Sequence, residues 1–236
     1  EMRFVAVKDE HQQAVLTLHR MREQLVKMRT MQINQLRGLL YEFGANLPKG
    51  RQQGMAQVGA QLAQLEDTLP AMVIDALRGQ LQRVQALSDD IEDIERKLAL
   101  WKKEDAAAKR LMAIPGVGLL TATAAVATIG DAKVFKNGRQ FAAFLGLVPR
   151  QAGTGGKVRL FGISKRGDTY LRKLLIHGAR SVITHQKARA PWLEQLLARR
   201  PFNAAVVALA NKMARTIWAL LAHDRTYQNG VTAQAA

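Results

Sequence analysis

A glycine- and cation-rich segment from Gly153 to Gly167 holds the residues best suited to chemistry on a polyanion. It reads Gly-Thr-Gly-Gly-Lys-Val-Arg-Leu-Phe-Gly-Ile-Ser-Lys-Arg-Gly, and its Ser164 is one of three serines in the chain. A serine hydroxyl can attack a phosphodiester where cations stabilise the negatively charged transition state. Lys165 and Arg166 adjoin this serine, and glycines let a backbone approach a ligand closely. The segment therefore predicts nucleic-acid binding, with Ser164 as the candidate catalytic nucleophile.

The competing interpretation of this serine is structural. Ser164 or Asp168 could cap the helix expected from Thr169 to His185, and spacing alone favours a cap over a nucleophile. The other two serines, Ser88 and Ser181, lie within predicted helices and do not compete for the catalytic role. The cations expected to contact nucleic acid are Lys157, Arg159, Lys165, Arg166, Arg172 and Lys173.

A second glycine motif, Ile114-Pro-Gly-Val-Gly118, precedes this segment and fits the apolar-x-Gly-apolar-Gly pattern of a helix-hairpin-helix. In that motif the glycines turn the chain tightly and direct free amides of the next helix at a phosphate. We therefore add Gly116 and Gly118 to the predicted nucleic-acid contacts. An ordinary tight turn between two helices explains the motif equally well when it is considered alone.

The run Gly153-Thr-Gly-Gly-Lys157 superficially resembles a nucleotide-binding P-loop. That motif requires glycine at position 151 and serine or threonine at position 158, where this chain has Gln151 and Val158. No ATPase is predicted, and a hairpin tip that carries Lys157 and Arg159 towards phosphates explains the residues better.

Charge and composition point to the same kind of partner. The 236-residue chain has a net charge of +16, and the segment from Ala132 to Arg200 contains 15 Lys and Arg against two acids. Such a concentrated positive charge predicts a nucleic-acid partner. With no cysteine, no secretory signal and no apolar run of 18 residues, a cytoplasmic protein without a membrane partner is expected. The histidines form no i,i+4 pair and no acidic cluster accompanies them, so no metal site is predicted.

The first half of the chain reads as two long helices. Apolar residues at helical spacing predict the first from Asp9 to about Phe43, and a connector is expected over 47–69. Pro70 begins the second, in which Leu77, Val84, Ile91 and Leu98 recur every seven residues. Leu87, Ile94 and Trp101 form a second set offset by three. This heptad seam predicts a coiled-coil arm and hence a homo-oligomer, although a helix packed within its own bundle is equally compatible.

Beyond Arg110 glycines become frequent and the predicted elements shorten. We expect helices over 119–129, 139–146, 169–185, 191–199 and 202–223, and a β-hairpin over 148–161 that turns at 153–156. The predicted fold is mainly α, with a long helix and coiled-coil arm followed by a small helix-hairpin-helix domain. The corresponding domains are 1–46 (long helix), 47–69 (linker), 70–110 (arm), 111–225 (C-terminal domain) and 226–236 (disordered tail).

The ordered set of motifs resembles a known family. Ile114-Pro-Gly-Val-Gly118, Ile129-Gly-Asp131, Phe141-Ala-Ala-Phe-Leu-Gly-Leu-Val-Pro149, Gly155-Gly-Lys157 and Ile163-Ser-Lys-Arg-Gly167 occur in sequence. They resemble the C-terminal domain of insertion-sequence transposases whose N-terminal half is a RuvC-type DEDD domain. The first helix, with Leu36-Arg37-Gly38-Leu39-Leu40, resembles the end of that N-terminal half.

The resemblance implies a bacterial, bridge-RNA-guided recombinase that acts on DNA as a tetramer. It implies a serine that becomes linked to DNA, matching Ser164, and an Mg²⁺ site in the acidic RuvC-like half. Nothing here resembles the strand-borne acids of that half. We therefore expect a fragment that binds nucleic acid and does not recombine DNA alone.

Three functional hypotheses remain open from the sequence. The first is a transposase or recombinase piece that acts on DNA phosphodiesters. The second is a non-catalytic nucleic-acid-binding module, a truncated transposase remnant or an accessory. The third, an RNA-binding accessory related to ribosome or repair factors, shares the charge argument but leaves Ser164 unexplained.

Overall fold

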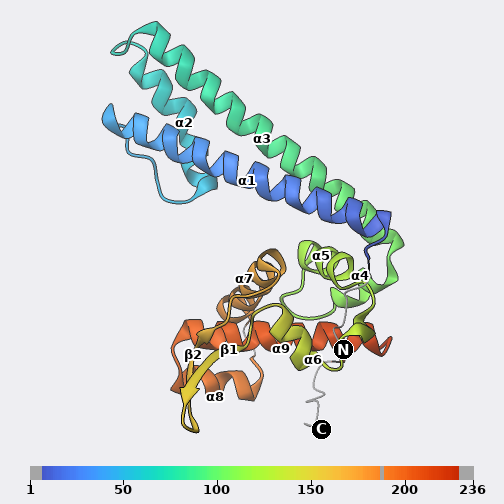
Figure 1. Cartoon of the computed structure of the whole chain (residues 1–236). Coiled ribbons are helices and arrows are strands. Elements are labelled where there is room, and N and C mark those ends of the chain that lie inside the picture. The colour runs from blue at the N-terminus through green and yellow to red at the C-terminus, as the bar shows by residue number, and fades with distance from the viewer. Residues whose placement is uncertain (1–6, 187–188, 229–236) are drawn as a thin grey trace. The chain divides into compact units, whose positions relative to one another are not determined.

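The computed structural model describes residues 7–186 and 189–228 and is mainly helical (Figure 1). It divides into two compact units, Thr17–Lys97 and a larger one formed by Glu1–Leu16 with Leu98–Ala236. The elements in the described ranges are α1 (Glu10–Glu42), α2 (Arg51–Leu65), α3 (Ala71–Glu104), α4 (Ala106–Leu111), α5 (Leu119–Ile129), the 3-10 turn η1 (Ala132–Val134), α6 (Gly138–Phe144), β1 (Pro149–Thr154), β2 (Lys157–Ile163), α7 (Thr169–His185), α8 (Pro191–Arg199) and α9 (Phe202–Ala222).

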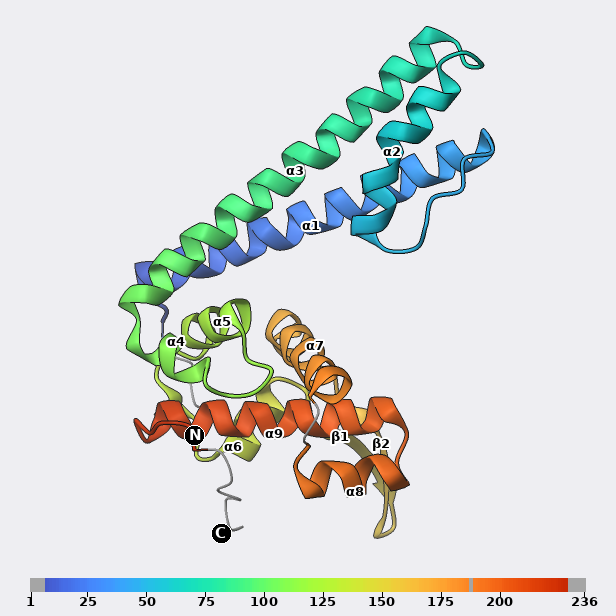
Figure 2. The same cartoon turned by 180° about the vertical axis from the view of Figure 1, so that it is seen from behind.

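In the smaller unit α1 and α3 run antiparallel, with α2 beside them (Figures 1 and 2). The Arg22 guanidinium donates to the Glu95 carboxylate at 2.7 Å, and the Gln80 amide donates to the Gln32 carbonyl at 3.1 Å. At the end where the three helices meet, a buried cluster combines side chains from each of them. Its members include Leu36 and Leu40 from α1, Val58 and Leu62 from α2, and Leu77 from α3.

Helix α2 lies where the sequence predicts a connector, so that prediction is wrong for 51–65. Gly54, one of the glycines in this range, has a packing role. Gly54 is buried, and a Cβ there would collide with the Arg37 guanidinium. Arg37 in turn donates to the carbonyls of Pro48 and Gly50 at 2.6 and 2.7 Å. A cation of α1 thus holds the entry to α2, and Gly54 lets the α2 backbone lie close to that guanidinium without displacing it.

The heptad seam of α3 is covered within the single chain. Leu77, Val84, Ile91, Ile94 and Leu98 are all buried. Because these side chains are already removed from water, the structure favours the helix packed in its own bundle over an intermolecular zipper through the seam. The predicted homo-oligomer stays a prediction, and this seam does not offer a free surface for it.

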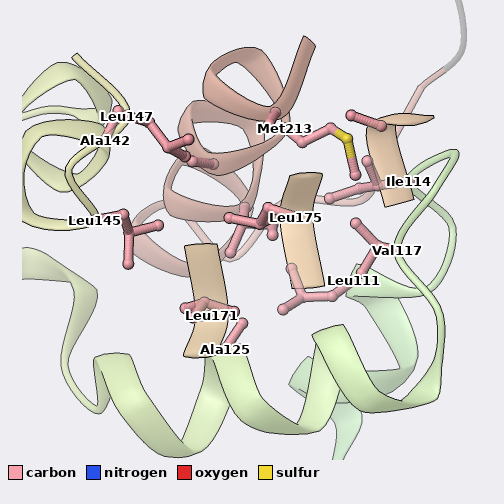
Figure 3. Packing of buried hydrophobic residues seen from close by; sticks show 14 of the residues in the cluster. Leu111, Ile114, Val117, Ala125, Ala142, Leu145, Leu147, Leu171, Leu175 and Met213 are labelled. Carbon is pink, nitrogen blue, oxygen red and sulfur yellow. The ribbon is translucent and has the colours of Figure 1, made fainter. Parts of the chain in front are cut away.

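The larger unit is organised around α9, which contacts α4, α6, α7, α8 and η1. Leu171 of α7 lies beside Ala125 of α5, with Leu111, Leu175 and Met213 in the same cluster (Figure 3). Helix α9 is the one helix in the described ranges whose length and hydropathy would allow a membrane crossing. Its buried residues belong to this apolar core, as expected of a central helix.

Elements of the larger unit agree closely with the sequence-based expectations. Helices α5, α7 and α8 have the predicted bounds, and α6 and α9 differ by one or two residues. Strands β1 and β2 form a two-stranded antiparallel sheet that turns at Gly155 and Gly156. Both glycines have positive φ, of 59° and 78°, as a tight hairpin turn requires. The tail predicted over 226–236 lies, from residue 229 onward, outside the described residues.

Candidate nucleophile and nucleic-acid interface

Ser164 lies immediately after β2, in a loop whose backbone is held against the segment that precedes β1. Its amide donates to the Val148 carbonyl at 2.8 Å, and the Lys165 amide donates to the Gly146 carbonyl at 3.2 Å. These bonds fix the main chain that carries the serine. The side chain itself is half-buried, and its hydroxyl has no hydrogen-bond partner in the part of the chain that the structure describes.

The helix cap that competed with a catalytic role belongs to Asp168. Its carboxylate accepts from the Leu171 amide at 2.8 Å, at the N-terminus of α7. A capping side chain satisfies an amide that has no partner within the helix. Since Asp168 has this task, the Ser164 hydroxyl is left without a structural one.

The loop carries backbone strain next to the serine. Lys165 has φ of 56°, a conformation that residues with a Cβ adopt uncommonly. Gly167 (φ 81°) in this loop and Gly146 (φ 69°) in the segment before β1 are in close contact with other main-chain atoms. A Cβ would collide with the Arg166 carbonyl at Gly146 and with the Phe144 carbonyl at Gly167. Strained backbone held in place by its surroundings is typical of functional loops.

Arg172 differs from the sequence-based expectation that it contacts nucleic acid. It is only 7% exposed, and its Nη1 donates to the carbonyls of Leu145 and Arg166 at 2.8 and 3.0 Å. Its Nη2 donates to the Thr169 hydroxyl at 3.2 Å. These bonds join α6, the Ser164 loop and α7 from inside. Arg172 is therefore a positioning residue, and the sequence could not reveal this because the carbonyl partners at 145 and 166 converge only in the fold.

The other predicted cations fall into two groups. Lys165 and Arg166 are exposed on the Ser164 loop, and Lys157 and Arg159 are exposed on β2. Lys173 is half-buried, with its Nζ 5.1 Å from the centre of the Tyr170 ring. The structure thus presents four of the six predicted cations to solvent, on the hairpin and on the loop that follows it.

The hairpin also carries an aromatic contact that the sequence analysis missed. Phe161 is 37% exposed, and the guanidinium carbons of Arg150 and Arg159 lie 5.0 and 5.4 Å from the centre of its ring. The alternation of Lys157, Arg159 and Phe161 along β2 was the available signal, because alternate residues of a strand share a face.

The glycine motif at 114–118 turns the chain between α4 and α5. Gly116 has φ of 83°, and a Cβ there would lie 2.8 Å from the Gly178 carbonyl of α7. Gly118 begins α5 as its N-cap and is exposed, with nothing near the position of a Cβ. The first glycine therefore serves packing, whereas the second lies at an exposed helix start. A helix-hairpin-helix contact to phosphate stays a prediction for Gly118, and Gly116 would support it indirectly.

Acidic side chains suitable for a metal do not gather in the described residues. Within 7–186 and 189–228 no group of three or more His, Asp or Glu side chains could hold a metal ion. The donor set that a two-metal phosphodiester reaction uses is therefore not assembled there.

Comparison with known proteins identifies the family. Residues 108–193 match the sequence profile described as the Transposase IS116/IS110/IS902 family, a range that includes the glycine motif, the hairpin and the Ser164 loop. Over 234 residues the chain is 48% identical to a "Probable family 20 transposase" of Pseudomonas aeruginosa, covering 97% of this chain and 69% of the relative. This chain belongs to the IS116/IS110/IS902 transposase family.

Other members of this transposase family align over a similar range. The transposase for insertion sequence element IS1111A of Coxiella burnetii is 42% identical, with 97% of this chain and 64% of that protein aligned. The transposase for IS1328 of Yersinia enterocolitica is 41% identical, with 92% and 65% aligned. The chain thus spans about two thirds of the length of these transposases.

Proposed function

We propose that this transposase chain binds DNA across the hairpin and the Ser164 loop, and that Ser164 is the nucleophile on a DNA phosphodiester. The observation that carries the proposal is the Ser164 hydroxyl itself. It projects from a backbone that two main-chain hydrogen bonds fix, while Asp168 takes the capping role. A hydroxyl held in place without an internal partner is available to a substrate.

The proposed step exchanges one phosphoester bond for another. The Ser164 oxygen forms a bond to phosphorus, and the bond from phosphorus to a deoxyribose oxygen breaks. The serine proton is lost, and the departing sugar oxygen gains a proton, so charge and atoms balance. Lys165 and Arg166 would stabilise the extra negative charge on the phosphoryl oxygens during this exchange.

The positive surface supports binding of a DNA backbone. Lys157, Arg159, Lys165 and Arg166 are exposed on two consecutive elements, in a segment with 15 Lys and Arg against two acids. Contacts of this kind supply affinity without reading the sequence, and they weaken steeply as salt is raised.

Finer parts of the proposal come from the resemblance of the motif set to bridge-RNA-guided recombinases. This resemblance implies that a guide RNA selects the DNA and that the protein acts as a homo-oligomer. It also implies that acidic residues of a RuvC-like half hold Mg²⁺. The described residues do not offer a fitting Mg²⁺ donor set. We therefore expect this chain alone to bind DNA without recombining it. Strand transfer by the isolated chain with Mg²⁺ would overturn that expectation.

Covalent capture tests the role of the serine. In a transposase that contains this chain, wild-type protein should form a protein–DNA adduct that survives denaturation, detectable as a shifted labelled band. Ser164→Ala should abolish the adduct while leaving DNA affinity within about twofold, because a hydroxyl contributes little to backbone binding. Ser181→Ala is the matched control, since Ser181 is an exposed serine of α7 and should be dispensable. An adduct that persists in Ser164→Ala excludes Ser164 as the nucleophile.

A non-catalytic nucleic-acid module is the second candidate. It is favoured by one observation: no side chain of the described residues accepts a hydrogen bond from the Ser164 hydroxyl, so a general base is not in place. This candidate predicts salt-sensitive DNA binding by the same surface and no adduct with any variant.

A further inference from the structure

The hairpin projects from the larger unit with both of its faces open to solvent. Every residue of β1 is exposed, and β2 is exposed from Lys157 to Gly162, with Ile163 half-buried. On one face of β2 lie Lys157, Arg159 and Phe161, and on the other Val158 and Leu160 are 67% and 62% exposed. An isolated two-stranded hairpin is marginally stable in water. A hairpin with no other element packed on its faces would therefore be stabilised by a bound ligand.

The basic face brings two guanidinium groups close to one aromatic ring. Two guanidiniums lie near the Phe161 ring of β2, with Arg150 of β1 at 5.0 Å and Arg159 of β2 at 5.4 Å from the ring centre. Guanidinium planes and aromatic rings both stack on nucleobases, and a guanidinium also pairs with phosphate. This face therefore combines backbone recognition with a surface for the π-face of a base.

This aromatic group lies close to Ser164 along the chain. Phe161 and Ser164 lie three residues apart, on β2 and directly after it, and the Ser164 amide bond to Val148 continues the main-chain pairing at the base of the hairpin. At roughly 3.3 Å per residue in an extended strand, the two are about 10 Å apart along the backbone. Residues three apart on a strand begin on opposite faces, so a DNA strand that contacts both Phe161 and Ser164 would pass over the edge of the ribbon, with the bound nucleotide about one or two nucleotides from the phosphodiester presented to Ser164.

We infer that the Arg150–Phe161–Arg159 face of the hairpin binds an unpaired DNA nucleotide next to the phosphodiester that Ser164 is proposed to attack. In a paired duplex the π-faces of the bases are covered by their neighbours, and only edges and backbone are accessible. Phe161 therefore distinguishes unstacked DNA from paired DNA, whereas the surrounding cations bind both. The inference rests on the proposed DNA-binding function and names the DNA structure that this part of the site prefers.

The test compares single-stranded and fully paired DNA of the same 20-nucleotide sequence, titrated into the full chain by fluorescence anisotropy. Phe161→Leu keeps an apolar β-strand side chain and removes the aromatic ring, and Phe161→Trp retains a ring. We expect Phe161→Leu to weaken single-strand binding about 5- to 100-fold, the range for one lost stacking contact, and to change duplex binding less than about twofold. Phe161→Trp should retain single-strand affinity.

Phe202 provides a matched control within the chain. It is 42% exposed, and the Arg180 guanidinium carbon lies 5.7 Å from its ring centre, so it is a similar cation–aromatic pair on α7 and α9 instead of on the hairpin strands. Phe202→Leu should leave both affinities unchanged. A 2-aminopurine placed in the single strand should also lose fluorescence on stacking with wild-type protein and less so with Phe161→Leu.

The outcomes separate this inference from the proposed function. If wild-type protein binds neither DNA form, the proposed DNA-binding function fails. If it binds DNA, and Phe161→Leu weakens single strand and duplex equally or weakens neither, only the stacking inference is overturned. Preference for a single-stranded RNA of the same sequence with no effect on DNA would likewise overturn the assignment to DNA.

Discussion

The Arg172 guanidinium, buried in α7, donates a 3.0 Å hydrogen bond to the carbonyl of Arg166, the second residue after Ser164. The same nitrogen donates to the Leu145 carbonyl at 2.8 Å. Arg172 thus holds the Ser164 loop at Arg166, while main-chain bonds from Ser164 and Lys165 hold the part of the loop next to β2. The loop is positioned from both directions by groups that do not face solvent.

Replacing Arg172 should therefore destabilise the larger unit. Arg172→Met removes a set of buried, charge-assisted hydrogen bonds and leaves the carbonyls of Leu145 and Arg166 without a donor. We expect the free energy of unfolding to fall by about 2–4 kcal/mol, measured by urea denaturation. Arg172→Lys should recover little of this loss, because a single ammonium group cannot reproduce the spread of guanidinium donors. Wild-type stability in Arg172→Lys would contradict this role.

A single engineered thiol can report the electrostatic surroundings of the candidate nucleophile. The chain has no cysteine, so Ser164→Cys carries one thiol only. The adjacent Lys165 and Arg166 favour a thiolate, and we expect the thiol pKa to lie below its ordinary value of about 8.5. The pH dependence of the alkylation rate measures that pKa.

The same probe has an internal control. In the triple variant that also carries Lys165→Gln and Arg166→Gln, the thiol pKa should rise towards its ordinary value. If removing both cations leaves the alkylation profile where it was, these cations do not stabilise negative charge at position 164.

The two glycines of the 114–118 turn should respond differently to alanine. Gly116→Ala introduces a Cβ at positive φ and against the Gly178 carbonyl of α7, and should cost about 1–3 kcal/mol of stability or more. Gly118→Ala meets open space at φ of −91° and should cost only a few tenths of a kcal/mol through a weaker N-cap. Thermal unfolding of the two variants checks the contrast, and equal effects would show that the turn does not pack on α7 as described.

Acid should weaken the smaller unit through His19. This side chain is 1% exposed, and burial, followed by the nearby Arg22 charge, lowers its pKa from 6.5 to about 4. Since the folded pKa lies below the unfolded one, the unfolded state binds more protons between these values. Stability is therefore present above pH 6.5 and is lost as the pH falls towards 4.

The expected size of this effect is about 2 kcal/mol at pH 5 relative to pH 7. Urea unfolding followed by circular dichroism at the two pH values measures it. His19→Gln, which cannot be protonated, should reduce the pH dependence by that amount. An unchanged pH dependence in His19→Gln would show that His19 does not titrate as described.

The sequence predicted the elements well and some side-chain roles poorly, for physical reasons. Proline at the start of α8, glycines at the hairpin turn and the aspartate cap of α7 are local signals, so the bounds of those elements could be predicted. The roles of Gly54 and Arg172 depend on partners at Arg37 and at Leu145, far along the chain. Local composition therefore suggested a linker for the first and a phosphate contact for the second.

Residues of the candidate site divide in the same way, into those that local sequence predicts and those whose roles depend on tertiary contacts. Ser164 and its adjacent cations were predicted because their types and order suggest chemistry, and the structure places them together on one loop with the hairpin leading into it. Arg150 and Phe161 were missed because their contact crosses between two strands, one of which carries a bulge. Choosing between the two caps needed coordinates, since Ser164 and Asp168 both precede α7.

The hairpin's exposure on both sides has an evolutionary consequence. Substitutions at Val158 or Leu160 remove little buried apolar contact, and so they cost little folding free energy. Selection can therefore vary these positions for substrate preference independently of the helical core beneath Ser164. Related transposases would diversify their choice of DNA along this ribbon first, while the carbonyl-holding arginine and the crowded glycines of the adjacent loop resist change.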